Sequence, residues 1–379
     1  MLKKGFYIAI CALFMTALAV AQPVSFDLTG DQEVDPVMTD SEGMCSGRLD
    51  ALATAFSLDC THNVGDAIAA HIHRAPAGVN GPIVFFLNSD TAFSFTVTAE
   101  TLADQPDAAT PISFDEFLEA LRAGNLYVNV HTVENSGGEI RGQIPAPDNT
   151  LYFAQFGSGA GDPMTNAPAI TSQITLLNTS ATPTSGEMHF NGDDGNPVDV
   201  TVGDVTGSDI PFTIEGNGVT QIDLTPGDML AVGSARSHSD KPLVGVIRFA
   251  IEGSGVTGVL GQGASTGLLA PVLVANGGVG SGGLDTGLAI QNAEAFDNTV
   301  TCELRDGDGM TVGMSEIGLD SQGHTAAFVT QLFEGAADFS MGFQGSVVCT
   351  SDSGFAMIAL EQGAAGSGIF NAVPAVPFN

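Results

Sequence analysis

Short segments of alternating apolar and polar residues, separated by glycine-rich turns, run through most of this chain. Residues 93–97 (Phe-Ser-Phe-Thr-Val) and 127–132 (Tyr-Val-Asn-Val-His-Thr) are clear examples. Alternation with period two predicts strands with one buried face, because successive side chains of a strand point to opposite faces. The 48 glycines among 379 residues can supply the many tight turns that such strands need. The pattern therefore predicts an all-β protein.

The first 21 residues have the features of an export signal rather than of a folded element. Lys3 and Lys4 precede an apolar run from Phe6 to Val20, and small residues end the run at Ala21. The run is too short to favour a membrane span, and no later stretch is long and apolar enough for one. We therefore expect an exported chain, periplasmic or extracellular, with no membrane span after signal cleavage.

Four cysteines lie outside the predicted signal: Cys45, Cys60, Cys302 and Cys349. An even number of cysteines in an exported chain indicates disulfides. Proximity along the chain pairs Cys45 with Cys60 and Cys302 with Cys349.

The chain is strongly acidic, with 43 Asp and Glu against 10 Lys and Arg and a net charge of −33. Two of the basic residues belong to the predicted signal, so the mature chain is more acidic still. Such a field repels phosphates, which argues against nucleic acid and anionic lipid head groups as partners. We interpret the acidity mainly as a source of solubility.

The first predicted unit covers residues 22–147. Ser113 and Glu116 form a capping-box pattern that predicts a helix from Phe114 to Arg122, with Gly124 as its end. The remaining apolar and alternating segments predict strands at 26–28, 47–52, 53–60, 70–73, 83–87, 93–97, 127–132 and 139–144.

Several motifs of this unit resemble the CHRD domain, which is named from chordin and occurs in many exported bacterial proteins. They are found in this order at residues 30–34, 70–73, 78–82, 127–132 and 138–143. The resemblance implies a β-sandwich fold like that of superoxide dismutases, and it implies no agreed enzymatic activity. The His-x-His strand is also similar to that of copper–zinc superoxide dismutases, but the further ligands that a second metal would need are absent from the sequence.

The remainder of the chain has the pattern of an internal repeat. Residues 174–178 correspond to 288–292 at an offset of 114, and 233–235 correspond to 345–347 at an offset of 112. Repeats of this length with short strands and glycine turns predict two immunoglobulin-like β-sandwiches, at 148–262 and 263–379. This half resembles tandem β-sandwich repeats of exported bacterial proteins.

The same alignment bears on the second disulfide. Cys302 and Cys349 align with Met188 and Ser237, so that one copy has both cysteines and the other has neither. A pair of cysteines that is present together in one copy and absent together from the other is expected for two residues that form a disulfide.

The strongest candidate site consists of His71, His73 and His131. In a strand, His71 and His73 share one face, and we expect the face that holds His131 to lie over or beside it. Three neutral imidazoles suit copper or zinc, with a fourth position for water or for a carboxylate such as Glu139. The alternative is a polar network in which the rings hydrogen-bond to Asn129, Thr132 and Glu139.

Other candidates have simpler structural interpretations. We expect Arg141 to form an internal ion pair with Glu139 or Glu33, rather than to anchor a substrate carboxylate. The acidic segments 193–195 and 306–309 hint at calcium loops but lack the full ligand spacing, and Asp-Gly favours hairpin turns there.

Residues 263–267 match the Gly-x-Ser-x-Gly pattern of a catalytic serine but lie at the junction between the repeats, so we interpret them as a flexible linker. No catalytic constellation is evident in the repeated half.

These observations predict an exported, non-enzymatic binding or surface-associated module. A copper or zinc ion held by the three histidines is its candidate ligand, with the polar network as the alternative, and a protein or surface ligand of unknown identity is its expected partner. Two alternatives stay open: a copper-dependent oxidoreductase similar to superoxide dismutase, and a purely structural or adhesion protein. Retention of metal, and turnover if metal is retained, would distinguish the three.

Overall fold

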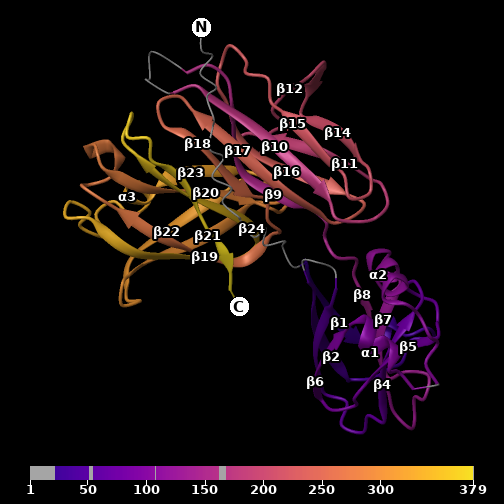
Figure 1. Cartoon of the computed structure of the whole chain (residues 1–379). Coiled ribbons are helices and arrows are strands. Elements are labelled where there is room, and N and C mark those ends of the chain that lie inside the picture. The colour runs from indigo at the N-terminus through magenta and orange to yellow at the C-terminus, as the bar shows by residue number, and fades with distance from the viewer. Residues whose placement is uncertain (1–21, 51–53, 107, 162–167, 379) are drawn as a thin grey trace.

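The computed structural model describes residues 22–50, 54–106, 108–161 and 168–378, and nearly all of their regular structure is antiparallel β-sheet. The predicted export signal, residues 1–21, lies outside the described residues. Figure 1 shows the N-terminal unit as a separate body. The chain leaves this body after β8 (Ile140–Ile144) and continues into the remaining strands. Within the described ranges, no helix is long and apolar enough to cross a membrane.

The N-terminal unit contains eight strands and three short helical segments: β1 (Gln22–Thr29), η1 (Gly30–Gln32), β2 (Glu42–Leu49), β3 (Phe56–His62), β4 (Ala69–Arg74), β5 (Ile83–Leu87), β6 (Ala92–Val97), α1 (Ala99–Ala103), α2 (Phe114–Arg122), β7 (Leu126–His131) and β8 (Ile140–Ile144). The strands form one sheet in the order β5-β4-β7-β8-β1-β2-β3-β6. Inward residues of β4 and β7 join those of β2 and β3 in a single core. The sheet is therefore folded on itself, as in a β-sandwich.

Helix α2 closes part of this core. The Ser113 hydroxyl accepts a hydrogen bond from the backbone N–H of Glu116 (3.2 Å), and the Glu116 carboxylate accepts one from the N–H of Ser113 (2.8 Å). Gly124 follows with φ +63°, a conformation that suits glycine after a helix. Phe117 is fully buried, and its ring lies 6.0 Å from that of Phe56 on β3. The helix boundaries predicted from the sequence are confirmed.

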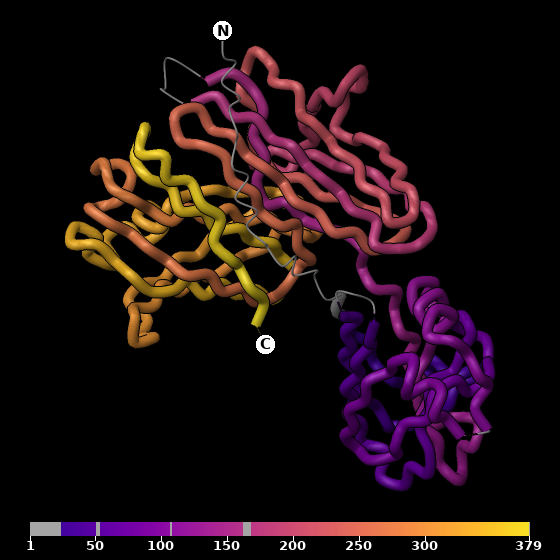
Figure 2. Tube along the Cα trace, viewed as in Figure 1, coloured from indigo at the N-terminus to yellow at the C-terminus, as the bar shows by residue number. Residues whose placement is uncertain are grey.

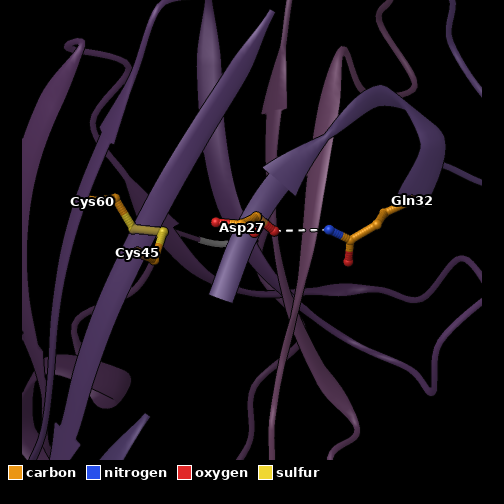
Figure 3. Close-up of a disulfide and its surroundings, with 4 residues drawn as sticks. All are labelled: Asp27, Gln32, Cys45 and Cys60. Atoms are coloured by element: carbon orange, nitrogen blue, oxygen red, sulfur yellow. Dashed lines mark hydrogen bonds between the residues drawn. A yellow bond between two sulfur atoms is a disulfide. The ribbon is translucent and has the colours of Figure 1, made fainter. Parts of the chain in front are cut away.

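The turn after β1 is held to the neighbouring strands by Gln32. Its Nε2 donates to the carbonyl of Asp27 (2.8 Å; Figure 3), while its Oε1 accepts from the N–H of Gln143 on β8 (3.1 Å). A Cβ on Gly30 would lie 2.3 Å from the carbonyl oxygen of Val37, so only glycine fits there. These contacts explain the glycine at position 30 and the glutamine at position 32 of the 30–34 motif.

The middle unit contains ten strands: β9 (Leu151–Ser158), β10 (Ile170–Asn178), β11 (Thr184–Asn191), β12 (Val200–Val202), β13 (Val205–Gly207), β14 (Asp209–Ile214), β15 (Val219–Asp223), β16 (Ala231–Ser239), β17 (Leu243–Ile251) and β18 (Gly255–Leu260). Two four-stranded sheets, β15-β10-β17-β18 and β14-β11-β16-β9, enclose a second core. Strands β12 and β13 form a separate ribbon.

The C-terminal unit contains the remaining elements: β19 (Ser265–Val274), η2 (Val279–Ser281), β20 (Leu284–Asn292), β21 (Asn298–Asp306), β22 (Thr311–Leu319), β23 (His324–Phe328), α3 (Val329–Leu332), β24 (Phe343–Gly363), β25 (Phe370–Val373) and β26 (Val376–Pro377). Strand β24 is 21 residues long and pairs with β19 and β21 in its first half and with β20 and β25 in its second. Its inward residues belong to a third core.

The middle and C-terminal units pack closely against each other, as the tube in Figure 2 shows. Ala356 and Ile358 of β24 belong to the same buried cluster as Phe153 of β9. His324 of β23 also reaches across, with its Nδ1 2.8 Å from the carboxylate of Asp193 in the middle unit.

Both predicted disulfides are present. Cys45 and Cys60 are directly opposite on β2 and β3 (Figure 3), and Cys302 and Cys349 are directly opposite on β21 and β24. All four cysteines are buried. Each bond therefore links two neighbouring strands within one sheet.

Two sequence interpretations need correction. The flexible linker expected at residues 263–267 is wrong from Ser265 onward, because these residues begin β19 and pair with β24. The strand expected at 47–52 is β2, which ends at Leu49, and the strand expected at 53–60 is β3, which begins at Phe56. Residues 51–53 lie outside the described residues. The acidic segment 306–309 is a hairpin turn, as expected, with the Asp306 carboxylate accepting from two backbone N–H groups.

Candidate metal centre

The three histidines lie on adjacent strands, on the face of the sheet opposite the core. Ala70 and Ile72 of β4 point into the core, so His71 and His73 point outward. Strand β7 pairs with β4 in a register that places Asn129 opposite His71 and Ala69 opposite His131. His131 is therefore the diagonal neighbour of His71. The pairing brings the predicted third imidazole beside the other two.

The three rings offer nitrogens to a common region. One ring nitrogen from each of His71, His73 and His131 lies within 4.8 Å of the others. The closest pair is His71 Nδ1 and His131 Nε2, at 3.0 Å. Nitrogen ligands around one Zn²⁺ or copper ion at ~2.0–2.1 Å are roughly 3.3–3.6 Å apart. Small side-chain adjustments therefore bring the three nitrogens to a common ion.

Backbone carbonyls fix the tautomers of two rings. His73 Nδ1 lies 2.9 Å from the carbonyl oxygen of Gly81, and His131 Nδ1 lies 3.1 Å from that of Ser136. A carbonyl only accepts, so each Nδ1 must donate and each Nε2 carries a lone pair. This is the arrangement that orients metal-ligating histidines in proteins. The Nε2 of His131 accepts a hydrogen bond from the Nδ1–H of His71 (3.0 Å). The Nε2 of His73 is buried and has no hydrogen-bond partner.

Aromatic side chains and a cation surround the rings. Phe86 of β5 contacts the ring of His71 edge-on at 4.6 Å, and Tyr127 of β7 stacks on His73 at 4.9 Å with an interplanar angle of 9°. The guanidinium of Arg141 lies 3.5 Å from the centre of the Tyr127 ring. Each histidine is only 8% exposed. The cluster is thus largely desolvated, on the outer face of the sheet.

Burial keeps the rings neutral. The pKa of His71 and that of His73 are lowered to about 4, mainly by desolvation, with neighbouring charges adding to the effect: His131 and His73 act on His71, and His131 and Arg141 act on His73. Desolvation also lowers the pKa of His131. Near neutral pH the rings are uncharged, which is the form that binds metal ions.

Arg141 does not form the ion pair expected from the sequence. Its guanidinium donates to the carbonyls of Val79 (3.1 Å) and Pro76 (3.2 Å) and to Gln143 Oε1 (3.0 Å). Among the described residues, no carboxylate lies within 4.0 Å of it. The reason is that the loop between β4 and β5 folds over the outer face of the sheet and supplies carbonyl acceptors, which the sequence alone does not reveal.

Two acidic residues near the cluster, Glu139 and Glu33, hydrogen-bond to residues other than the three histidines. Glu139 accepts hydrogen bonds from Thr39 (2.6 Å), Thr132 (3.1 Å) and Asn135 (2.6 Å). These bonds lower its pKa and hold its carboxylate away from the role of fourth ligand that we considered.

Glu33 is 7% exposed, and burial raises its pKa from the ordinary 4.5 to about 7, with the positive charge of Arg141 opposing the rise. Its Oε2 accepts a 3.5 Å hydrogen bond from Asn129, whereas Oε1 has no partner.

Sequence reasoning missed Tyr127, Phe86 and the carbonyls of Gly81 and Ser136. The register of β4 and β7 could have suggested Tyr127, because it follows the same alternation as His131. The other histidines do not join the cluster: His189 contacts Asp209, His238 contacts Thr150, and His324 contacts Asp193.

Comparison with protein families agrees with this description of the N-terminal unit. Residues 24–144 match the family model of the CHRD domain. The N-terminal unit is a CHRD domain. No curated protein matches the chain. The CHRD domain and the two disulfides indicate an exported protein.

Proposed function

We propose that this chain is an exported, non-enzymatic binding protein whose CHRD domain holds one copper or zinc ion through His71, His73 and His131. The observation that supports it best is the tautomer arrangement. The Nδ1 atoms of His73 and His131 hydrogen-bond to backbone carbonyls, which leaves both Nε2 atoms with their lone pairs, and one nitrogen of each of the three rings lies within 4.8 Å of the others. A bound ion would replace the hydrogen bond between His71 Nδ1 and His131 Nε2. A polar network would have given the buried Nε2 of His73 a partner, and it has none.

In this proposal the chain has three units, at 22–147, 148–262 and 263–379, after a signal at 1–21. The two β-rich units, interpreted as immunoglobulin-like repeats, present the CHRD domain and contact a protein or surface ligand in the periplasm or outside the cell. The shared buried cluster of Phe153, Ala356 and Ile358 supports a rigid pair of this kind.

Metal uptake by the purified mature chain tests the proposal. The protein is stripped with a chelator and dialysed against copper or zinc, and bound metal is counted by elemental analysis. We expect about one ion per chain, and we expect the double variant His71→Ala/His73→Ala to lose it. His238→Ala is the matched control, because this histidine is exposed and lies in the middle unit. Full loading of the double variant, or none in the wild type, would refute the proposal.

A further inference from the structure

The donor set of the proposed metal site carries no negative charge. Among the described residues, no cysteine, aspartate or glutamate joins the group formed by His71, His73 and His131. Glu139 is held by its three hydrogen bonds. Glu33 hydrogen-bonds to Asn129 and not to a histidine of the cluster. No anionic ligand therefore neutralises the positive charge of an ion at this site.

The surroundings make a high charge costly. Phe86 and Tyr127 place aromatic carbon against the rings of His71 and His73. Because β7 lies between β4 and β8, Arg141 is positioned behind the Tyr127 ring, no more than about 8 Å from the ring of His73. Its charge has no carboxylate within 4.0 Å among the described residues. A bound cation is therefore both desolvated and repelled.

Both costs depend on the charge of the ion. The cost of moving an ion out of water grows with the square of its charge, so a divalent ion loses about four times as much as a monovalent ion of similar size. Its repulsion from Arg141 is twice as large. At three-histidine zinc sites water supplies the fourth ligand of Zn²⁺, so the difference between the ions at this site is one of charge and not of donor number.

We propose that the ion held by His71, His73 and His131 is Cu(I), and that the site discriminates against divalent ions. This inference rests on the metal site proposed above and specifies its ligand. The selectivity comes from an uncharged three-imidazole donor set placed beside an arginine that, among the described residues, has no carboxylate within 4.0 Å.

Competition titrations test the selectivity. The mature chain, freed of metal, is titrated with Cu(I) without oxygen against bicinchoninate, and with Zn²⁺ against a chromogenic zinc chelator. We expect one Cu(I) per chain, bound at least about a thousandfold more tightly than Zn²⁺. X-ray absorption of the copper-loaded protein should show three nitrogen ligands and no fourth.

Two variants of Arg141 test the contribution of its positive charge to the selectivity. Arg141→Gln should raise the affinity for Zn²⁺ relative to that for Cu(I) by on the order of tenfold or more, since it removes one unit charge from behind the Tyr127 ring that stacks on His73. Arg141→Lys keeps the charge and should leave the ratio near its wild-type value. Circular dichroism of both variants checks that the loop contacts of Arg141 are not needed for folding. An unchanged ratio in a folded Arg141→Gln variant would overturn the electrostatic origin.

The outcomes separate this inference from the function proposed above. If Zn²⁺ binds through the three histidines as tightly as Cu(I), the selectivity is refuted and the metal site remains. If neither ion binds, both are refuted.

Discussion

The buried carboxyl of Glu33 gives a pH-dependent stability that the Glu33→Gln variant should lose. Burial raises its folded-state pKa from the ordinary 4.5 to about 7. Below pH 4.5 the group is protonated in both the folded and the unfolded state. As the pH rises, the unfolded chain loses the proton first, and the wild type is destabilised until the folded group also ionises near pH 7. A shift of this size corresponds to about 3 kcal/mol.

Hydrogen exchange measured by mass spectrometry on peptides from β7 and β8 can follow this effect in the full, metal-free chain. The opening free energy of Glu33→Gln relative to wild type should increase by about 3 kcal/mol between pH 4.5 and 7.

Glu139→Gln is the matched control in the same network. Hydrogen bonds from Thr39, Asn135 and Thr132 lower the pKa of Glu139, so this variant should instead lose stability relative to wild type once the pH exceeds the unfolded value. A difference between Glu33→Gln and wild type that stays flat from pH 4 to 8 would refute the reasoning.

Two further changes test the scaffold. Replacing Cys302 and Cys349 by serine opens a loop of 47 residues, which should destabilise the C-terminal unit by about 4 kcal/mol in calorimetry; an unchanged melting temperature would contradict it. Gly138→Ala places a Cβ 2.2 Å from Glu33 Oε1 at a residue with φ +140°, and should lower the stability of the CHRD domain by about 2 kcal/mol or more, whereas Gly137→Ala, with no atom near its Cβ, should change it little.

Local sequence signals predicted the elements whose boundaries depend on local chemistry. The capping box of Ser113 and Glu116 and the glycine at 124 were sufficient to delimit α2. The apolar run at residues 83–87 and the alternation at residues 93–97 located β5 and β6 to within one residue. The predicted ends of β2 and β3 were less accurate, because they depend on the pairing between these two strands, in which Cys45 lies opposite Cys60.

Residues that the proposed internal alignment makes equivalent hold corresponding places in the strand pairing. Met188 and Ser237 are opposite each other on β11 and β16, as Cys302 and Cys349 are on β21 and β24. The aligned asparagines Asn178 and Asn292 also both donate to backbone carbonyls four residues further on.

The candidate site was predictable in its residues but not in its surroundings. The His-x-His alternation gave the shared face of His71 and His73, and the motif at 127–132 gave His131. What the sequence did not predict was the contribution of the loops. The carbonyls of Gly81 and Ser136 set the tautomers, and the β4–β5 loop, rather than a carboxylate, binds Arg141. Such long-range contacts depend on the complete fold.

Anomalous diffraction from a crystal of the copper-loaded protein, recorded at the copper absorption edge, tests the proposed metal site most directly. We expect one strong peak, at about 2.0 Å from one ring nitrogen each of His71, His73 and His131. A peak elsewhere, for example at the acidic turns of residues 193–195 or 306–309, with none between the three imidazoles, would contradict it.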